Sequence, residues 1–220
     1  MSRPRTRATV HQLVSVVIGA FMIGLGVAFF AHAQLGLPPY DVLTSAMRDR
    51  TGLTLGQSAW ALSGMFFAIA AVLGQRPRIG GLLYVIACGA AVDATFSLLV
   101  DPDSIVMRIA FVAVGIVAIV AGISLVVHSG LTGGAFELLM RAGAERGLDP
   151  MKVRSSLEVG VVVAGVALGG DAGFATLAFA ISVGPVMSAA QQALLDHRAG
   201  RAARLAQTGS SPEVSEPAAG

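Results

Sequence analysis

The chain has 220 residues, of which 55% are hydrophobic and only 13% are charged, against about 25% charged in ordinary soluble domains. This balance argues against a water-soluble globular domain, because too few polar side chains exist to cover its surface. The single Cys88 argues against a disulfide-stapled secreted fold. A net charge of +2 without a dense basic cluster argues against nucleic-acid binding. A mean hydropathy of +0.75 and 27 glycines favour a bundle of membrane helices.

Six apolar stretches meet or approach the roughly 20 residues that a helix needs to cross a bilayer core of about 30 Å. These predicted spans are residues 13–31, 56–73, 79–100, 105–127, 153–169 and 173–195. The fifth carries Arg154 and Glu158 in its first two turns, and these can pair with each other one turn apart. Two shorter segments, 38–48 and 134–146, follow glycine-rich breaks and are predicted to be half-helices or interfacial helices.

Local signals mark several helix ends. Thr54 and Gln57 have the spacing of a capping box. Asp149 is a good cap that precedes Pro150 at a first helical position. Residues 101–105 begin with Asp-Pro-Asp and predict a polar turn between the third and fourth spans.

The charge distribution predicts how the chain is oriented. With the amino terminus inside, three arginines fall on the outer side and the other twelve basic residues fall on the cytoplasmic side. The outer three are Arg48, Arg50 and Arg108. We therefore expect a protein of the bacterial inner membrane with both termini in the cytoplasm, a basic segment at 1–10 and a disordered cytoplasmic tail at 197–220.

An internal repeat divides the chain into residues 11–100 and 106–196. Gly19, Gly26 and His32 recur 96 positions later as Gly115, Gly122 and His128. The breaks before the half-helices align at the same offset, and several later positions align at an offset of 95. Each unit holds three spans, an odd number, so the second copy is expected to insert upside down. Because the first span has a counterpart in mid-chain, we expect it to be retained rather than removed as a signal peptide.

Three runs of residues carry a resemblance to a known family. The chain is similar to the bacterial YczE family of multi-spanning membrane proteins, itself similar to the YitT group, over residues 11–196. Where the family pattern usually has Pro-Trp-Asp, this chain has Pro39-Tyr40-Asp41. The resemblance implies a polytopic all-α fold and supplies no biochemical activity. The runs are residues 26–43, 51–56 and 74–80.

Asp41 and Glu137 are the most informative candidate site residues. Each follows a break and an aromatic residue, Tyr40 or Phe136, and the repeat makes the two acids equivalent. Acids inside a membrane are costly, so the pair is a candidate site for an ion, a proton or an amine. The alternative is structural, because a carboxylate in the first turn of a helix interacts favourably with the free N–H groups there.

His32, His128 and Asp93 are further candidates. The histidines are repeat-equivalent and could relay protons with an acid, or they could simply lie at the membrane interface. They lack the closely spaced partners of a metal site, so no metal or other cofactor is expected. Asp93 lies within the third span and is either a site residue or a hydrogen-bond acceptor across the bundle.

Three functions remain open from the sequence. The first is a small-molecule or ion permease, exporter-like, whose site lies near the membrane midplane where the two breaks meet. The second is a scaffold that binds a partner protein or lipid without transport. The third is an intramembrane enzyme, disfavoured because no hydrolase or phosphate-binding signature is present. Gly165 to Gly169 form a small-residue face that suits packing within the chain or in a homodimer.

Overall fold

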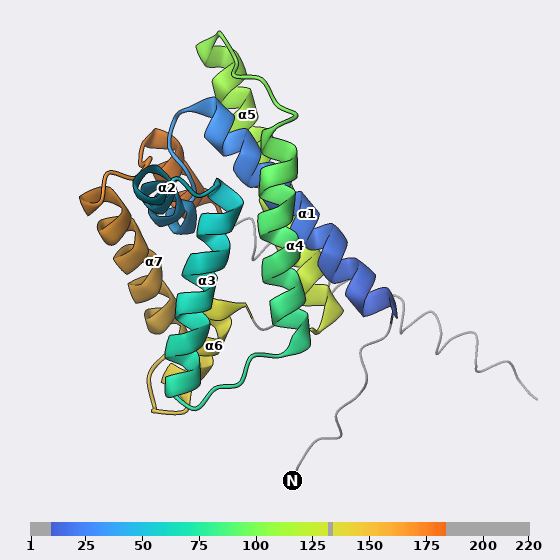
Figure 1. The fold of residues 1–220 in the computed structure, drawn as a ribbon, viewed down its shortest axis with the longest axis vertical. Coiled ribbons are helices and arrows are strands. Elements are labelled where there is room, and N and C mark those ends of the chain that lie inside the picture. The colour runs from blue at the N-terminus through green and yellow to red at the C-terminus, as the bar shows by residue number, and fades with distance from the viewer. Residues whose placement is uncertain (1–9, 132–133, 184–220) are drawn as a thin grey trace, which may run out of the picture.

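The computed structural model describes residues 10–131 and 134–183, which form helices joined by short turns. In chain order the helices are α1 (Val10–Ala33), α2 (Pro39–Thr51), α3 (Leu55–Val72), α4 (Ile79–Phe96), α5 (Ile105–Ser129), α6 (Ala135–Ala144) and α7 (Pro150–Ala167), followed by a helix at Phe174–Val183. Figure 1 shows the long helices side by side, with the short α2 and α6 toward opposite ends of the bundle. The predicted terminal segments 1–9 and 197–220 lie outside the described residues.

Four helices of the described part, α1, α3, α4 and α5, are long and apolar enough to cross a membrane. They correspond to the first four predicted spans. The fifth predicted span is a helix of 18 residues, α7, which carries Lys152, Arg154 and Glu158 in its first half. Of the sixth predicted span, only Phe174–Val183 falls within the described residues.

The helix ends form as their residues dictate. Thr54 accepts a hydrogen bond from the Gln57 N–H and the Gln57 side chain accepts one from the Thr54 N–H, which confirms the capping box. Helix α2 ends at Gly52, whose φ of 72° suits glycine and directs its N–H to the Arg48 carbonyl. Helix α7 begins at Pro150, as the sequence predicts.

Helices α1 and α5 cross in antiparallel fashion at four glycines. A Cβ on Gly19 would lie 2.6 Å from the Gly122 carbonyl oxygen, and one on Gly122 would lie 2.5 Å from the Gly19 oxygen. Gly26 and Gly115 meet in the same way, at 2.7 and 3.0 Å. The backbones are therefore too close for any larger residue, which is the role of small residues at membrane helix contacts.

Each short helix packs on a long helix of its own half and on one of the other half. Helix α2 packs on α7 and α3, whereas α6 packs on α3 and α7. At the end of α2, Arg50 donates a hydrogen bond to the Leu168 carbonyl (3.0 Å); after α6, Arg146 donates one to the Leu73 carbonyl (3.2 Å). Each arginine thus satisfies a carbonyl at the end of a long helix.

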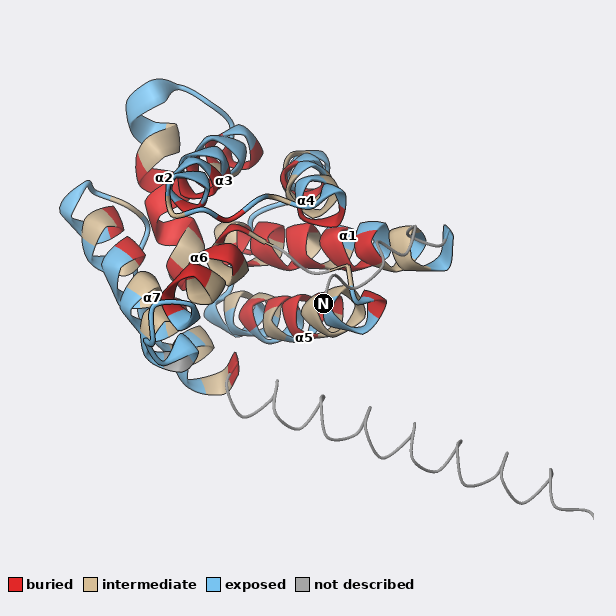
Figure 2. Cartoon of the chain, turned by 90° about the horizontal axis from the view of Figure 1, so that it is seen from below, coloured by how far each residue is buried: buried red, intermediate tan, exposed pale blue. Residues whose placement is uncertain are grey.

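Burial follows one face of each long helix. The buried residues of α1 face its neighbours, as Figure 2 shows, and include Phe30, Ala28 and Ala20 at 0% exposure. The opposite faces carry large exposed apolar side chains, such as Val17 and Phe21 on α1 and Ile86 on α4. A water-soluble protein rarely exposes such extended apolar surface, so these faces fit a lipid environment.

Candidate functional site

The first turns of α2 and α6 meet inside the bundle. The rings of Tyr40 and Phe136 are 5.5 Å apart in an edge-on arrangement, and Phe66 of α3 contacts both, at 6.3 and 5.2 Å. The Tyr40 hydroxyl hydrogen-bonds to the Ser63 hydroxyl (2.8 Å) and donates to the Ala59 carbonyl (3.3 Å). The structure therefore brings the two breaks together around a packed aromatic cluster.

Asp41 lies buried beside this cluster. Its side chain accepts a 3.3 Å hydrogen bond from the Thr44 hydroxyl, which also donates to the Asp41 carbonyl at 2.9 Å. Tyr84 and Cys88 of α4 lie close enough to interact with it electrostatically. The residue is 8% exposed, so its polar surroundings consist of protein groups rather than bulk water.

Glu137, the repeat equivalent of Asp41, has a different environment. Its side chain is 41% exposed and lies 3.8 Å from Arg141, one turn later on α6. Neither acid lines either of the two cavities described below. That Asp41 and Glu137 share one cavity therefore stays a prediction.

Asp93 joins α4 to the start of α3. One carboxylate oxygen accepts a hydrogen bond from the Thr54 hydroxyl (2.6 Å), and the other accepts one from the Gly56 N–H (2.8 Å). These contacts satisfy donors at the first turn of α3. They match the interpretation of Asp93 as an acceptor across the bundle.

His32 and His128 lie near opposite ends of the α1–α5 pair. His32 is buried, and its Nδ1 lies 2.5 Å from an oxygen of Asp101 while its Nε2 lies 2.9 Å from the Phe96 carbonyl oxygen. His128 is exposed at the end of α5. The two histidines are therefore separate features, and His32 pairs with an acid that the sequence indicated only as part of a turn.

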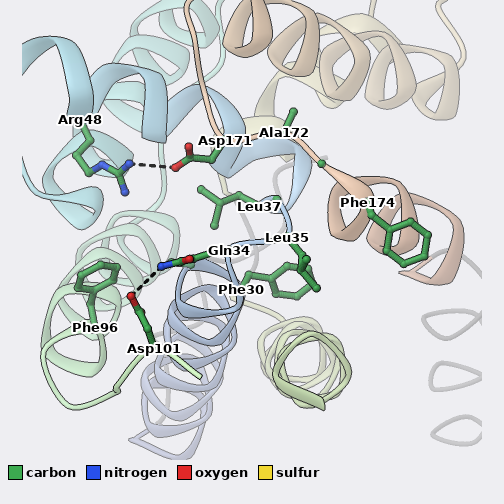
Figure 3. Close-up of a pocket in the computed structure, with 13 residues that line it drawn as sticks. Phe30, Gln34, Leu35, Leu37, Arg48, Phe96, Asp101, Asp171, Ala172 and Phe174 are labelled. Carbon is green, nitrogen blue, oxygen red and sulfur yellow. Dashed lines mark hydrogen bonds and ion pairs between the residues drawn. The ribbon is translucent and has the colours of Figure 1, made fainter. Parts of the chain in front are cut away.

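A half-open cavity of about 580 Å³ lies beside this pair, at the face that the charge distribution predicts to be outer. Figure 3 shows that the end of α1, the segment 34–37, Arg48, the turn at Asp101 and the segment 171–174 surround it. Phe96 and Phe174 supply exposed aromatic rings, whereas Phe30 is buried in the wall. Its charged lining residues are Arg48, Asp101 and Asp171, and Gln34 adds a neutral amide.

Two polar contacts hold the cavity wall. Arg48 of α2 forms an ion pair with Asp171 at 3.0 Å, which ties the first half of the chain to the second. A hydrogen bond to Asp49 raises the pKa of Arg48 above its ordinary value, so the guanidinium stays charged. On the other side, the Gln34 amide donates to Asp101 at 2.8 Å.

Sequence reasoning did not select these lining residues. Arg48 and Asp101 were assigned only to outer loops, and Gln34 and Asp171 were not singled out. Their partners are 67 and 123 positions away in the chain. The one local signal is that all four residues fall in the three connections on the predicted outer side, which marks an outer surface but no pairing.

A second cavity, an apolar groove of about 300 Å³, lies toward the predicted cytoplasmic end. It runs between α3, α6 and α7, and Arg146 is its one charged lining residue in the described part of the chain. Within residues 10–131 and 134–183, no three His, Cys, Asp or Glu side chains gather as a metal site would require.

Length, apolar faces and glycine-mediated packing define a polytopic helical membrane protein. A family of unknown function, DUF6198, matches residues 10–192, and the chain belongs to this family. It is 30% identical over 179 residues to a protein of Haemophilus influenzae named only as uncharacterized. This alignment covers 80% of this chain and 82% of the relative. It is 27% identical over 172 residues to the uncharacterized membrane protein YczE of Bacillus subtilis, covering 77% and 80%. The resemblance to the YczE family is thereby confirmed, and no solved structure matches the chain significantly.

Proposed function

We propose that the chain is a small-molecule permease of the bacterial inner membrane, built as an inverted repeat. The observation that carries the proposal is the polar cavity at one face, where segments of both halves meet: Arg48 comes from the first half, Asp171 from the second, and Asp101 from the turn between them. A closed apolar core would instead favour a scaffold. Solute binding and release need no covalent chemistry, so the proposal assigns no catalytic residue.

The inverted repeat is supported by contacts that recur between equivalent positions. The pair Gly19 and Gly122 becomes Gly115 and Gly26 when each residue is exchanged for its counterpart 96 positions away, and both pairs are in contact. Tyr40 and Phe136 are counterparts of each other and touch. A contact between equivalent residues is expected on the axis that relates the two halves.

The helix ends and turns recur too. The hydrogen bond from Arg50 to Leu168 has its counterpart in the bond from Arg146 to Leu73. Left-handed backbone conformations occur in pairs at offsets of 95 or 96. These pairs are Gln34 with Gly130, Gly52 with Gly147, and Gly74 with Gly169.

In this proposal the aromatic cluster of Tyr40, Phe66 and Phe136 separates the outer cavity from the cytoplasmic side. The two half-helices would present their first turns to a solute near the midplane, as discontinuous helices do in transporters. Asp41 and Glu137 would then be reached only after the aromatic cluster rearranges. Movement of one half against the other would open the path alternately to the two sides.

Flux in proteoliposomes tests this function. Efflux and uptake of a panel of small metabolites and organic ions is compared for the wild type, Ala172→Trp and Ala61→Trp. Ala172 lines the cavity, whereas Ala61 lies exposed on α3 away from it. We expect Ala172→Trp to abolish flux and Ala61→Trp to leave it unchanged. Absence of flux for every solute in the wild type would refute the permease.

The apolar groove favours a second candidate, a scaffold that binds lipid. Phe66, Leu139 and Leu157 line the groove, and Arg146 lies among them with its guanidinium held by the Ala142 and Leu73 carbonyls. An apolar groove with a basic residue on the cytoplasmic side suits an anionic lipid. Co-purified anionic lipid that is lost on Leu157→Trp, together with no flux, would favour this function over transport.

A further inference from the structure

Both ring nitrogens of His32 face atoms that only accept hydrogen bonds. Nδ1 lies 2.5 Å from a carboxylate oxygen of Asp101, and Nε2 lies 2.9 Å from the carbonyl oxygen of Phe96. The imidazole is 8% exposed, so water cannot replace these partners readily. The Phe96 ring packs against it as well, with the ring centroids 4.6 Å apart.

Counting protons shows what this arrangement requires. A neutral imidazole carries one N–H and so can donate to only one of the two acceptors. Satisfying both contacts requires one more proton, either on the second ring nitrogen or on the Asp101 carboxyl. The His32–Asp101 pair therefore has a place for one additional proton. Both hydrogen bonds of the His32 ring can form only while the pair carries this proton.

The acidic member of the pair, Asp101, lies in the wall of the outer cavity. The Asp101 side chain is 55% exposed and lines the cavity, so a proton on the pair can exchange with water there. Gln34 donates to the other Asp101 oxygen at 2.8 Å and fixes the carboxylate at the cavity surface.

Within the described residues, the other charges around the pair leave Asp101 without a permanent cation. Across the cavity, Arg48 is paired with Asp171 and Asp49. Arg108 of α5 donates to the Pro102 carbonyl, next to Asp101 in the chain, and Asp103 lies in the same turn. Helix α4 contributes the carbonyl and ring of Phe96.

Loss of the proton would leave the Asp101 carboxylate facing a cavity lined by the exposed rings of Phe96 and Phe174. A carboxylate beside aromatic rings is the environment that binds an organic ammonium ion. We propose that the His32–Asp101 pair is a proton-binding site and that a monovalent organic cation in the outer cavity displaces this proton. The inference names the solute class of the proposed permease and, as far as transport is concerned, rests on that function.

Calorimetry with benzyltrimethylammonium tests the site directly. This cation carries no titratable proton, so any pH dependence of its binding comes from the protein. The full chain in detergent is titrated between pH 5 and 8, in two buffers of different ionisation enthalpy. We expect about one proton released per cation bound, and an association constant that rises up to about tenfold per pH unit while the pair is protonated. Undetectable binding, or binding without proton release, would overturn the proposal.

Asp101→Asn gives the sharpest variant. Its amide can donate to Nδ1 of a neutral His32 while Nε2–H donates to Phe96, so all contacts persist without the extra proton. We expect a folded protein that neither binds the cation nor releases a proton. Asp103→Asn, in the same turn but outside the cavity lining, should behave as the wild type. Unchanged binding in Asp101→Asn would contradict the proposal; if that variant does not fold, the two-buffer titration of the wild type decides alone.

Failure of this inference can be told from failure of the permease. Proton-linked cation binding without flux of any solute would retain the site and refute transport. Flux of a neutral or anionic solute through a protein that shows no proton-linked cation binding would retain transport and refute the site.

Discussion

Arg50 and Arg146 make the same contact at opposite ends of the bundle, yet their surroundings differ. Each donates to the carbonyl that ends a long helix of the other half, Leu168 or Leu73. Near Arg50 lies the polar cavity of Arg48, Asp101 and Asp171; Arg146 itself lies in an apolar groove. This backbone contact thus recurs at the two ends while the side chains around it differ. In the proposed inverted repeat, an asymmetric site would be built on equivalent backbone contacts.

The prediction with the largest expected effect concerns the orientation of the chain in the membrane. A reporter active only in the cytoplasm, fused at Gln75, should be active, whereas the same reporter between Asp101 and Asp103 should be silent. The reason is the excess of Lys and Arg in the loops on the Gln75 side. Reversed activities would place the polar cavity in the cytoplasm and the apolar groove outside.

The glycine crossing of α1 and α5 should be the most sensitive part of the framework. Leucine at Gly122 would force a Cβ within 2.5 Å of the Gly19 carbonyl oxygen, so we expect Gly122→Leu to lower the stability by about 1–3 kcal/mol or to prevent folding. Gly64→Leu on α3 is the matched control, because no atom lies within 4 Å of its added Cβ. Thermal unfolding in detergent and the monodisperse yield measure both. Equal losses of stability in the two variants would show that the close glycine contacts between α1 and α5 are no more sensitive to substitution than an exposed helix position.

The two arginine contacts test how alike the two ends are. Replacing either arginine by methionine keeps an apolar stem and removes the hydrogen bonds to the carbonyls. We expect a loss of about 1 kcal/mol for each, slightly more for Arg146→Met because that residue donates to two carbonyls. Arg76→Met, at an exposed loop position, should leave the melting temperature unchanged. A loss in only one of the two variants would show that the framework is not equivalent at its two ends.

The sequence predicted the first four membrane helices and the start of α3 because these features depend on local signals. Long apolar runs mark the membrane helices, and the Thr54–Gln57 spacing marks a helix start. The cavity could not be predicted in this way. His32 and Asp101 are 69 positions apart and Arg48 and Asp171 are 123 apart, and nothing in the sequence around any of the four indicates its partner. Only the packing of α2 against the segment after α7 brings the second pair together.

The aromatic centre shows the same limit within the predicted site. Tyr40 and Phe136 were noted as equivalent residues before equivalent acids, and they do meet. The acids behind them do not share an environment, because Asp41 is buried against Thr44 while Glu137 is partly exposed beside Arg141. Equivalence in the sequence fixes the position of a side chain along its helix. It does not determine which neighbours surround it.

The smallest effect on stability, and the sharpest test of the candidate acids, comes from Asp41→Asn and Glu137→Gln. Asparagine keeps the size of Asp41 and an oxygen that can accept from Thr44, and it is itself favourable at helix starts. A purely structural role should therefore survive Asp41→Asn with a loss of about 1 kcal/mol or less. Glu137→Gln should cost less still, because its ion pair with Arg141 is exposed. A role in holding a proton or cation should not survive Asp41→Asn, because a neutral amide neither exchanges that proton nor balances the ion.

Thermal stability and solute flux are measured together for each variant and for the double variant. Loss of flux at unchanged stability in Asp41→Asn alone would assign the site to the buried acid and leave Glu137 as its structural counterpart. Unchanged flux in all three would make both acids structural and leave solute recognition to the outer cavity.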